Sequence, residues 1–346
     1  QAQGDKNLII NGGMQVAQRS TSLTVGDSTE YKTLDRYAIA INGTTAGRAT
    51  MSQATDAPSG FGSSMKFDVT TADTSIGAGE AFGFAQRIEG QNLQQLAKGT
   101  SDAKACTLSF YAKGTAKTYV VETRDANSRQ VSATFSVTTS WQRFEITIPA
   151  DTAGTIADDN TTELQIIWWL HAGSDFTSGT LNTSWATSVN ANRMVGCGSI
   201  FSSTDNELLI TGIQLQVGDV ATPFEHRSFG DELARCQRYF TRIPRIDGSS
   251  ANTEIANGMG NATNNFLGVI SFPTEMRANP TLTASGSFRV FNGGTLNPTA
   301  GPSRSSSSTV CMGISVATGG GISTLNGLLL TLNNDSDANL QFSAEL

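Results

Sequence analysis

The residues that could do chemistry in this chain are few, and their spacing matches no familiar catalytic arrangement. There are two histidines, His171 and His226. His171 precedes Asp175, which would suit a serine–histidine–aspartate triad, but no Gly-x-Ser-x-Gly segment presents a nucleophile. His226 lies between Glu225 and Arg227, either of which could contact it. We therefore expect no hydrolase triad.

Carboxylate pairs for glycoside hydrolysis have no spacing signature, because two groups about 5–9.5 Å apart can come from any two elements. Equivalent candidates are Asp68, Glu80, Glu89, Glu122 and Glu145. A chain of 346 residues is short for the large β-helical platform of a depolymerase. We expect the protein not to be an enzyme, and a polysaccharide-degrading activity stays a lesser alternative.

Metal ligation and disulfide formation are weakly indicated. The oxygen-rich segments 158–160 and 333–337 could suit calcium, but neither matches an EF-hand loop. Asp and Asn commonly bond to their own backbone in turns, so we interpret both segments as polar turns and expect no metal and no cofactor. The cysteines, at positions 106, 197, 236 and 311, form no Cys-x-x-Cys pair. We expect buried free thiols, with a Cys106–Cys197 disulfide left open.

Composition excludes several classes of partner. The net charge is −7 and no basic cluster is present, so nucleic acid is not expected as a partner. No apolar run reaches the ~18 residues that a membrane-spanning helix needs, and residues 1–6 are too polar for a signal peptide. Only 15% of residues are charged, and 35 are glycine. This mixture favours short strands joined by many turns.

Hydrophobic alternation with a period of two predicts a largely β protein. Strands are expected over residues 14–19, 37–41, 64–69, 106–111, 118–123, 131–137, 141–148 and 164–170. The pair Asn42–Gly43 predicts a hairpin turn, and the phase slip between Trp141 and Phe144 predicts a bulge. Two short helices are expected, over residues 91–98 and 231–239.

About ten strands before Gly218 suit a two-sheet jelly roll. Later apolar runs at 266–272, 281–284, 287–291, 310–316 and 327–332 predict a second, smaller β-sandwich, and 301–308 a flexible exposed loop. The fold class is therefore all-β, with an N-terminal jelly-roll β-sandwich, a short helix and a smaller C-terminal β-sandwich. The expected divisions are a tail at 1–6, the jelly roll at 7–220, a junction with the helix at 221–240 and the C-terminal sandwich at 241–346.

Sugar rings bind against aromatic faces, with hydrogen bonds from amides and carboxylates. Trp168 and Trp169 are neighbours in a strand and point to opposite sides, so one belongs to the core and the other can face solvent or a subunit. Trp185 lies in a loop rich in Ser, Thr and Asn. The candidate glycan-contact residues are Trp185, Trp169 and Tyr111. The alternative for Trp185 is that it tucks its loop onto the core.

Several segments resemble virion appendage proteins of tailed bacteriophages, the tail and head fibres. Residues 7–13 (NLIINGG) resemble the opening of carbohydrate-binding-module-like jelly rolls, and residues 210–217 their last strand. Residues 211–240, which contain ATPFEHRS, resemble a junction between two β-domains of the appendage proteins. Segments 86–93, 107–113 and 272–280 also resemble that family.

This resemblance implies a protein of the virion surface, on the tail or the capsid exterior, that forms homo-oligomers, often trimers. It implies contact with the host envelope or with other virion proteins. The function we expect is a fibre or spike subunit that binds host cell-surface polysaccharide for attachment. The alternative is a purely structural role as head decoration or adaptor. Loops 292–297 and 305–308 would be recognition loops or solvated linkers.

Overall fold

The chain forms two compact units that meet within one helix. The computed structural model describes residues 7–244, 252–291, 293–296 and 298–346. The first unit spans Gln1–Glu232 with Leu346, and the second spans Leu233–Glu345, so the division falls inside helix α2 (Phe229–Gln237). Both units are built of antiparallel sheets, which confirms the all-β prediction.

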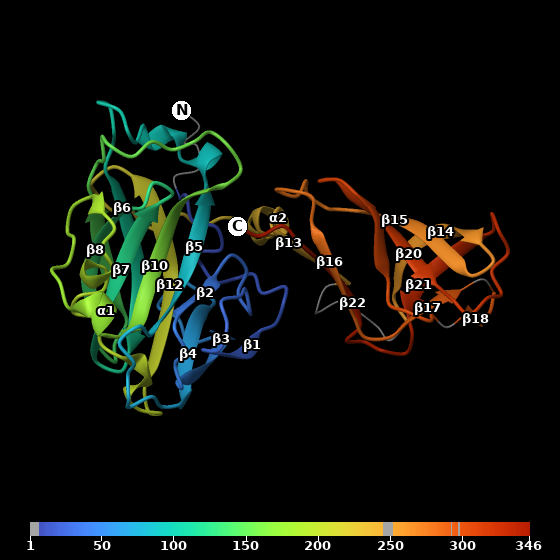
Figure 1. The fold of residues 1–346 in the computed structure, drawn as a ribbon, viewed down its shortest axis with the longest axis horizontal. Helices are drawn as coiled ribbons and strands as arrows, with labels where there is room; N and C mark the ends of the chain where they lie inside the picture. The colour runs from blue at the N-terminus through green and yellow to red at the C-terminus, as the bar shows by residue number, and fades with distance from the viewer. Residues whose placement is uncertain (1–6, 245–251, 292, 297) are drawn as a thin grey trace. The chain divides into compact units, whose positions relative to one another are not determined.

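The first unit consists of two six-stranded sheets (Figure 1). Sheet A has the order β1 (Ser22–Val25), β3 (Arg48–Ala54), β4 (Ser64–Thr71), β12 (Glu207–Val217), β6 (Cys106–Gly114), β9 (Gln142–Ile148). Sheet B has the order β11 (Ala186–Thr187), β8 (Arg129–Val137), β7 (Lys117–Asp125), β10 (Thr162–Ala172), β5 (Ala81–Glu89), β2 (Ala38–Asn42). Apart from β3–β4 and β7–β8, neighbouring strands in these sheets are not consecutive in the chain, as in a jelly roll.

The core of the first unit lies between the inner faces of the two sheets. Trp168 of β10 is fully buried and stacks on Phe84 of β5, with ring centroids 4.9 Å apart. Phe67 of sheet A stacks on the same Phe84 at 5.3 Å. Each such aromatic side chain contributes about 1.5–3 kcal/mol on burial, so this cluster binds the sheets together.

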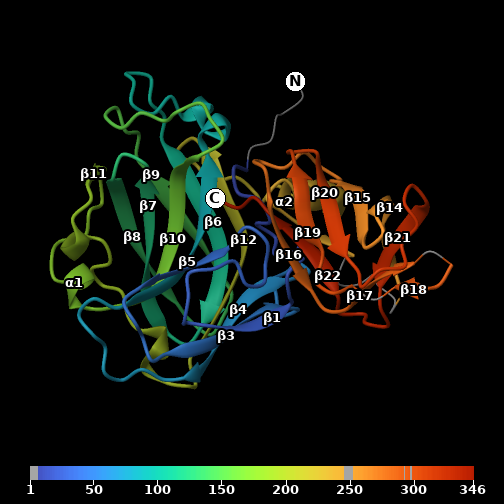
Figure 2. The ribbon, with the colours of Figure 1, turned by 45° about the vertical axis from the view of Figure 1, so that its right-hand side comes forward.

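The outer face of sheet B is covered by the segment between β10 and β12. This covering segment, residues 173–199, includes α1 (Ser174–Thr177) and the 3-10 turn η3 (Asn190–Asn192), and Figures 1 and 2 show α1 beside β7 and β8. Phe176 and Met194 of this segment pack with Val120, Ile167 and Trp169 of the sheet. Sheet B is therefore buried on both faces over its central strands.

Three expectations about local structure are wrong for identifiable reasons. Residues 91–98 form two 3-10 turns, η1 (Gly90–Asn92) and η2 (Gln94–Leu96), because Ala97 is left-handed at φ 47° and ends the helical path. Asn42–Gly43 does not close a hairpin, since β2 pairs with β5 in sheet B while β3 belongs to sheet A. Residues 14–19 are no strand, because the Asn11 side chain bonds the backbone at Gln15 and Val16.

Two more expectations fail at strand edges. The register of β6 with β9 runs without interruption from Ala112–Gln142 to Cys106–Ile148, so no bulge separates Trp141 from Phe144. Trp141 simply precedes the strand. The predicted loop 301–308 contains an edge strand, β19 (Ser303–Ser307), which pairs with β20. Its serines remain largely exposed, as an edge strand allows.

The segments that resemble the appendage family close the first unit. Asn7 donates from Nδ2 to the Ile213 carbonyl (3.1 Å), and its Oδ1 accepts from the Leu215 N–H (3.0 Å). Glu225 accepts from the Asn7 N–H at 2.7 Å, and Arg227 donates to the Ile9 carbonyl at 3.0 Å. The start of the jelly roll is thereby bound to its last strand and to the junction.

Asn7→Ala is expected to lower the free energy of unfolding by about 2–3 kcal/mol, because it leaves buried backbone groups of β12 without partners. Urea unfolding followed by circular dichroism measures this change. The exposed Asn127, which donates to the Thr155 carbonyl, provides the control, and Asn127→Ala should change stability by less than about 1 kcal/mol. Equal effects of the two substitutions would contradict a closing role for Asn7.

The second unit also has two sheets around one core. Its three-stranded sheet has the order β13 (Phe240–Ile243), β22 (Asn339–Ser343), β16 (Thr281–Ser285). Its seven-stranded sheet has the order β18 (Thr295–Leu296), β17 (Phe288–Phe291), β21 (Gly327–Leu332), β14 (Glu254–Ala262), β15 (Asn265–Ser271), β20 (Cys311–Ala317), β19. Phe266, Met312, Leu330 and Phe342 share one hydrophobic cluster between them. This is the smaller sandwich that the later apolar runs predict.

The structure also shows the state of the cysteines and the length of the helices. Cys106, Cys197, Cys236 and Cys311, all within the described residues, are free thiols, so the Cys106–Cys197 disulfide is not formed. Burial raises the pKa of the Cys106 thiol to about 12, which makes it unreactive at neutral pH. Within the described ranges, every helix is too short or too polar to span a bilayer.

Candidate functional site

Four rings from three separate segments form an aromatic cluster on the surface of the first unit. Phe61, from the β3–β4 connection, lies 5.4 Å from Tyr111 of β6, 5.0 Å from Phe224 and 5.3 Å from His226, between ring centroids. Phe224 and His226, from the junction, are 4.9 Å apart. His226 is exposed and the other three rings are half-buried. We call these four residues the aromatic surface.

A glycine in β12 makes room for the aromatic surface. Gly212 has φ +62°, and a Cβ there would lie 2.7 Å from the Phe61 ring and 2.9 Å from the Tyr111 ring. The register between β12 and β6 shifts between Thr211 and Gln214, so the strand is locally bent beneath these rings. Only glycine meets both demands, since it tolerates positive φ and leaves the rings in place.

A polar flank continues the aromatic surface along β6. Lys113, two residues after Tyr111 and therefore on the same face, lies 5.5 Å from the centre of the Trp141 ring. Asp56 accepts from Lys113 Nζ at 2.5 Å and from Trp141 Nε1 at 3.1 Å. The hydrogen bond from Lys113, and to a smaller extent the one from Trp141, lower the pKa of the Asp56 carboxyl below its ordinary value. Arg143 of β9 pairs with Tyr111 across the ladder.

The sequence-predicted contact residues occupy three different environments. Tyr111 belongs to the aromatic surface. Trp185 is half-buried, donates from Nε1 to the Pro149 carbonyl (2.8 Å) and has Lys98 Nζ 4.5 Å from its ring centre, so it tucks its loop onto the core. The alternative for Trp185, in which it holds its loop against the core, therefore fits the structure.

Trp169 is not on the surface, contrary to the expectation that one of the paired tryptophans faces solvent. Its side chain is only 4% exposed, because the covering segment lies on the outer face of sheet B. Trp169 Nε1 donates to Glu122 at 2.8 Å, and Arg193 of the covering segment binds the same carboxylate through two 2.9 Å contacts. A sugar cannot reach this ring while the segment is in place.

Phe61, Phe224 and His226 were not identified from the sequence. In the junction, Phe224 and His226 flank Glu225, and two rings so close together could have indicated a contact surface. The sequence instead suggested that the junction connects two domains. Phe61 lies in a glycine- and serine-rich connection with no pattern to assign it. Its position beside Tyr111 depends on the fold alone.

The residues considered for catalysis all have other partners. His171 is fully buried, and its Nδ1 lies 2.8 Å from Ser199 Oγ, while Asp73 and Glu80 are the carboxylates near its Nε2. The candidate acids Asp68, Glu80, Glu89, Glu122 and Glu145 contact Lys66, His171, Gln91, Arg193 and Arg143, respectively. Of these five acids, Glu80 also has a second carboxylate nearby, because one oxygen of Asp73 lies within 4.8 Å of one of its own.

The two oxygen-rich segments form turns through their own carboxylates. Asp159 accepts from the Thr161 N–H and hydroxyl, at 2.8 and 2.7 Å. Asp335 accepts from the backbone of Ser287 (2.8 Å) and of Asp337 (3.0 Å). These contacts are the ones that a polar turn requires.

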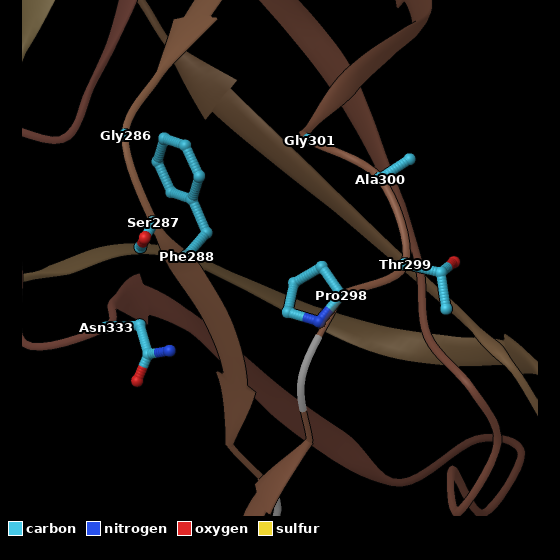
Figure 3. Close-up of a pocket in the computed structure, with 8 residues that line it drawn as sticks. All are labelled: Gly286, Ser287, Phe288, Pro298, Thr299, Ala300, Gly301 and Asn333. Carbon is cyan, nitrogen blue, oxygen red and sulfur yellow. The ribbon is translucent and has the colours of Figure 1, made fainter.

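A shallow pocket of ≈ 390 Å³ lies in the second unit (Figure 3). Its lining consists of Gly286, Ser287, Phe288, Pro298, Thr299, Ala300, Gly301 and Asn333. Hydroxyl and amide groups are available there, but Phe288, the aromatic ring of the pocket, is only 5% exposed. Of the loop 292–297, residues 292 and 297 fall outside the described part of the chain. Because its one aromatic ring is buried, this pocket is a weaker candidate for sugar binding than the aromatic surface.

Comparisons with known proteins give structural likenesses at low sequence identity. No protein-family model matches the chain, and no curated protein matches it. Among solved structures, the enzymatically active domain of bacteriophage CBA120 tailspike protein 4 is 14% identical, with a TM-score of 0.32, and covers 61% of this chain. This chain spans about a fifth, 21%, of that protein.

Carbohydrate-binding modules are also among the similar structures. The family 11 module of the cellulase Lic26A-Cel5E of Clostridium thermocellum is 12% identical, with a TM-score of 0.29, covering 59% of this chain and 99% of the module. TmCBM61, solved with β-1,4-galactotriose, is 12% identical, with a TM-score of 0.31, covering 62% of this chain and 99% of that one.

Proposed function

We propose that the protein is a fibre or spike subunit of a tailed-bacteriophage virion, which binds host cell-surface polysaccharide through the aromatic surface and has no catalytic role. The observation that carries this proposal is the cluster of four half-buried or exposed rings with the Trp141–Lys113–Asp56 flank beside it. Rings offer stacking for sugar C–H groups, and the flank offers one cation, one carboxylate and an indole.

Binding at one such site is expected to be weak, because it is shallow and open to water. Association costs several kcal/mol of lost translational and rotational freedom, and few contacts offset that loss. An oligomer, for which a trimer is the expected form, presents several copies to a repeating polysaccharide. Linked weak sites then gain about 10²–10⁴ in overall affinity without new contacts.

The virion part of the proposal is supported by the sequence resemblance. The junction motif of residues 211–240, which resembles appendage proteins, binds the start of the jelly roll, residues 7–13, to its end. A surface position on tail or capsid exterior would expose the aromatic surface to the host. The partners are then the host polysaccharide and other virion proteins.

A structural role as head decoration or adaptor is the second candidate, and one observation favours it. Apolar side chains lie on the solvent side of the seven-stranded sheet of the second unit: Met259 on β14, Val269 on β15 and Phe291 on β17 are 48%, 59% and 38% exposed. Leu329 of β21 pairs with Phe291, and Leu267 of β15 with Met259. Such a face suits contact with another subunit.

Immunogold labelling of intact particles with an antibody to this chain separates the two candidates. Label at the tail end is the expected result, and it directs a screen of host polysaccharides. Label confined to the head would favour decoration or a head fibre, and glycan binding would then be tested second. Absence of label from every particle would contradict a virion role.

A further inference from the structure

Three side chains from distant parts of the first unit converge at one end of the jelly roll. Asp73 follows β4, Glu80 immediately precedes β5, and His171 is the penultimate residue of β10. One ligand atom from each, a ring nitrogen of His171 and one carboxylate oxygen from each of Asp73 and Glu80, lies within 4.8 Å of the other two. His171 Nε2 and Glu80 Oε2 are 3.6 Å apart.

The imidazole in this cluster has one nitrogen engaged and the other free. Nδ1 lies 2.8 Å from Ser199 Oγ. Nε2 is buried and has no hydrogen-bond partner among the residues that the structure describes, while the His171 side chain is fully inaccessible to solvent. A buried polar atom without a hydrogen-bond partner destabilises the folded state, so a group that engages Nε2 would stabilise the fold.

The arrangement presents negative charge to a lone pair. If Nδ1–H donates to Ser199, Nε2 carries the lone pair and lies 3.6 Å from a carboxylate oxygen of Glu80. Histidines that bind metals through one nitrogen usually donate from the other, which fixes the ring orientation.

We propose that Asp73, Glu80 and His171 bind a divalent transition-metal cation of the zinc class, which clamps the ends of β4, β5 and β10 together. One imidazole nitrogen and two carboxylate oxygens form the kind of mixed ligand set that Zn²⁺ accepts, with water in a fourth position. Calcium and magnesium prefer all-oxygen sets with more ligands.

The dimensions of the cluster fit one small ion. Two ligands about 2.1 Å from a tetrahedral zinc lie about 3.4 Å apart, close to the Nε2–Oε2 separation in this site. A pair at the 4.8 Å limit would have to close by about 1.4 Å to reach this ligand spacing. Glu80, with 15% of its side chain exposed, is the ligand with room to make this movement.

The other two ligands are held in place. Asp73 accepts from Thr45 Oγ1 (2.8 Å) and from the backbone of Ala46 (3.0 Å) and Ser75 (3.1 Å). Its own N–H donates to the Phe201 carbonyl at 2.8 Å, two residues after Ser199. A cation here would therefore connect sheet A, sheet B and the end of the covering segment.

The test is zinc binding by the full-length protein after dialysis against a chelator. We expect one Zn²⁺ per chain by isothermal titration calorimetry and a higher melting temperature with Zn²⁺, but not with equal concentrations of Mg²⁺ or Ca²⁺. Glu80→Gln keeps the side-chain shape and the acceptor for the Gly77 N–H, and should weaken zinc binding at least about tenfold.

Glu145→Gln, a change at an exposed acid on β9, is the matched control and should bind zinc like the wild type. Because the free thiols could bind zinc as well, Co²⁺ absorption adds a second readout. We expect the visible bands of nitrogen and oxygen ligation without a thiolate charge-transfer band. No zinc-dependent change in the wild type, or equal affinity in Glu80→Gln, would overturn the proposal.

Discussion

Replacing Lys98 by methionine is expected to lower the free energy of unfolding by about 3–5 kcal/mol, because it removes the cation that contacts buried Asp125 and leaves buried Asp151 with Arg129 alone. Lys98 Nζ contacts Asp125 at 2.5 Å and Asp151 at 2.9 Å, and donates to the Gly154 carbonyl at 3.0 Å. The side chains of the three charged residues are at most 5% exposed. Methionine keeps the apolar stem but not the charge.

The same cluster predicts the direction of the acid response. Burial of Asp151 opposes ionisation, but hydrogen bonds from Arg129 and Lys98 outweigh it and hold the pKa of this carboxyl well below its ordinary value. A depressed folded-state pKa stabilises the protein above the unfolded value of about 3.9, and this contribution is lost as pH falls below it. Wild-type stability should therefore fall below about pH 4, and less steeply in Lys98→Met, where one of the two stabilising cations is gone.

Urea unfolding at pH 7 and pH 3.5 measures both effects. Lys66→Met is the control, since Lys66 is a partly exposed strand residue whose partners Asp68 and Glu207 are solvent-accessible. That change should cost less than about 1 kcal/mol. A Lys98→Met protein as stable as the wild type at pH 7 would show that the buried carboxylates do not depend on this lysine.

The paired substitution Phe61→Ala and Tyr111→Ala is expected to abolish measurable binding to the host polysaccharide. Stacking on one aromatic ring is worth about 0.5–1.5 kcal/mol beyond its contact area, so two lost rings weaken each site by tenfold or more. In an oligomer that binds through several sites the loss multiplies, because overall affinity depends on each linked site. Surface plasmon resonance on immobilised host polysaccharide measures the change.

Trp185→Ala is the informative control for this loss. It removes the hydrogen bond to Pro149 and the contact with Lys98, so stability should fall by about 1–3 kcal/mol while polysaccharide binding stays near the wild-type value below the melting temperature. The opposite pattern, with binding lost in Trp185→Ala and kept in the double variant, would move the site to the 181–188 loop.

The jelly roll was predictable because a strand with one face on the core keeps an alternating pattern of apolar and polar residues in its sequence. Trp168 illustrates this, since its place in an apolar strand predicts burial and the structure shows it stacked in the core. The burial of its neighbour Trp169, in contrast, could not be predicted from the strand pattern. Its exposure depends on residues 173–199, whose packing on sheet B rests on the Glu122–Arg193 pair, 71 residues apart in the sequence.

The candidate site was predictable only in part, for a similar reason. Tyr111 has a flat face on a recognisable strand, so its type and position suggest a contact residue. Its partners Phe61 and Phe224 come from irregular segments, whose positions are set by the bend at Gly212 and by the closing junction. The Asp73–Glu80–His171 cluster likewise brings together three segments with no shared spacing.

The most direct test of glycan binding at the aromatic surface is hydroxyl-radical footprinting by mass spectrometry, with and without saturating host polysaccharide. We predict that bound polysaccharide protects Phe61, Tyr111 and Trp141 from oxidation and leaves the oxidation of Trp185 unchanged. Protection confined to the second unit or to the 181–188 loop, or unchanged oxidation of the aromatic surface under saturation, would contradict it.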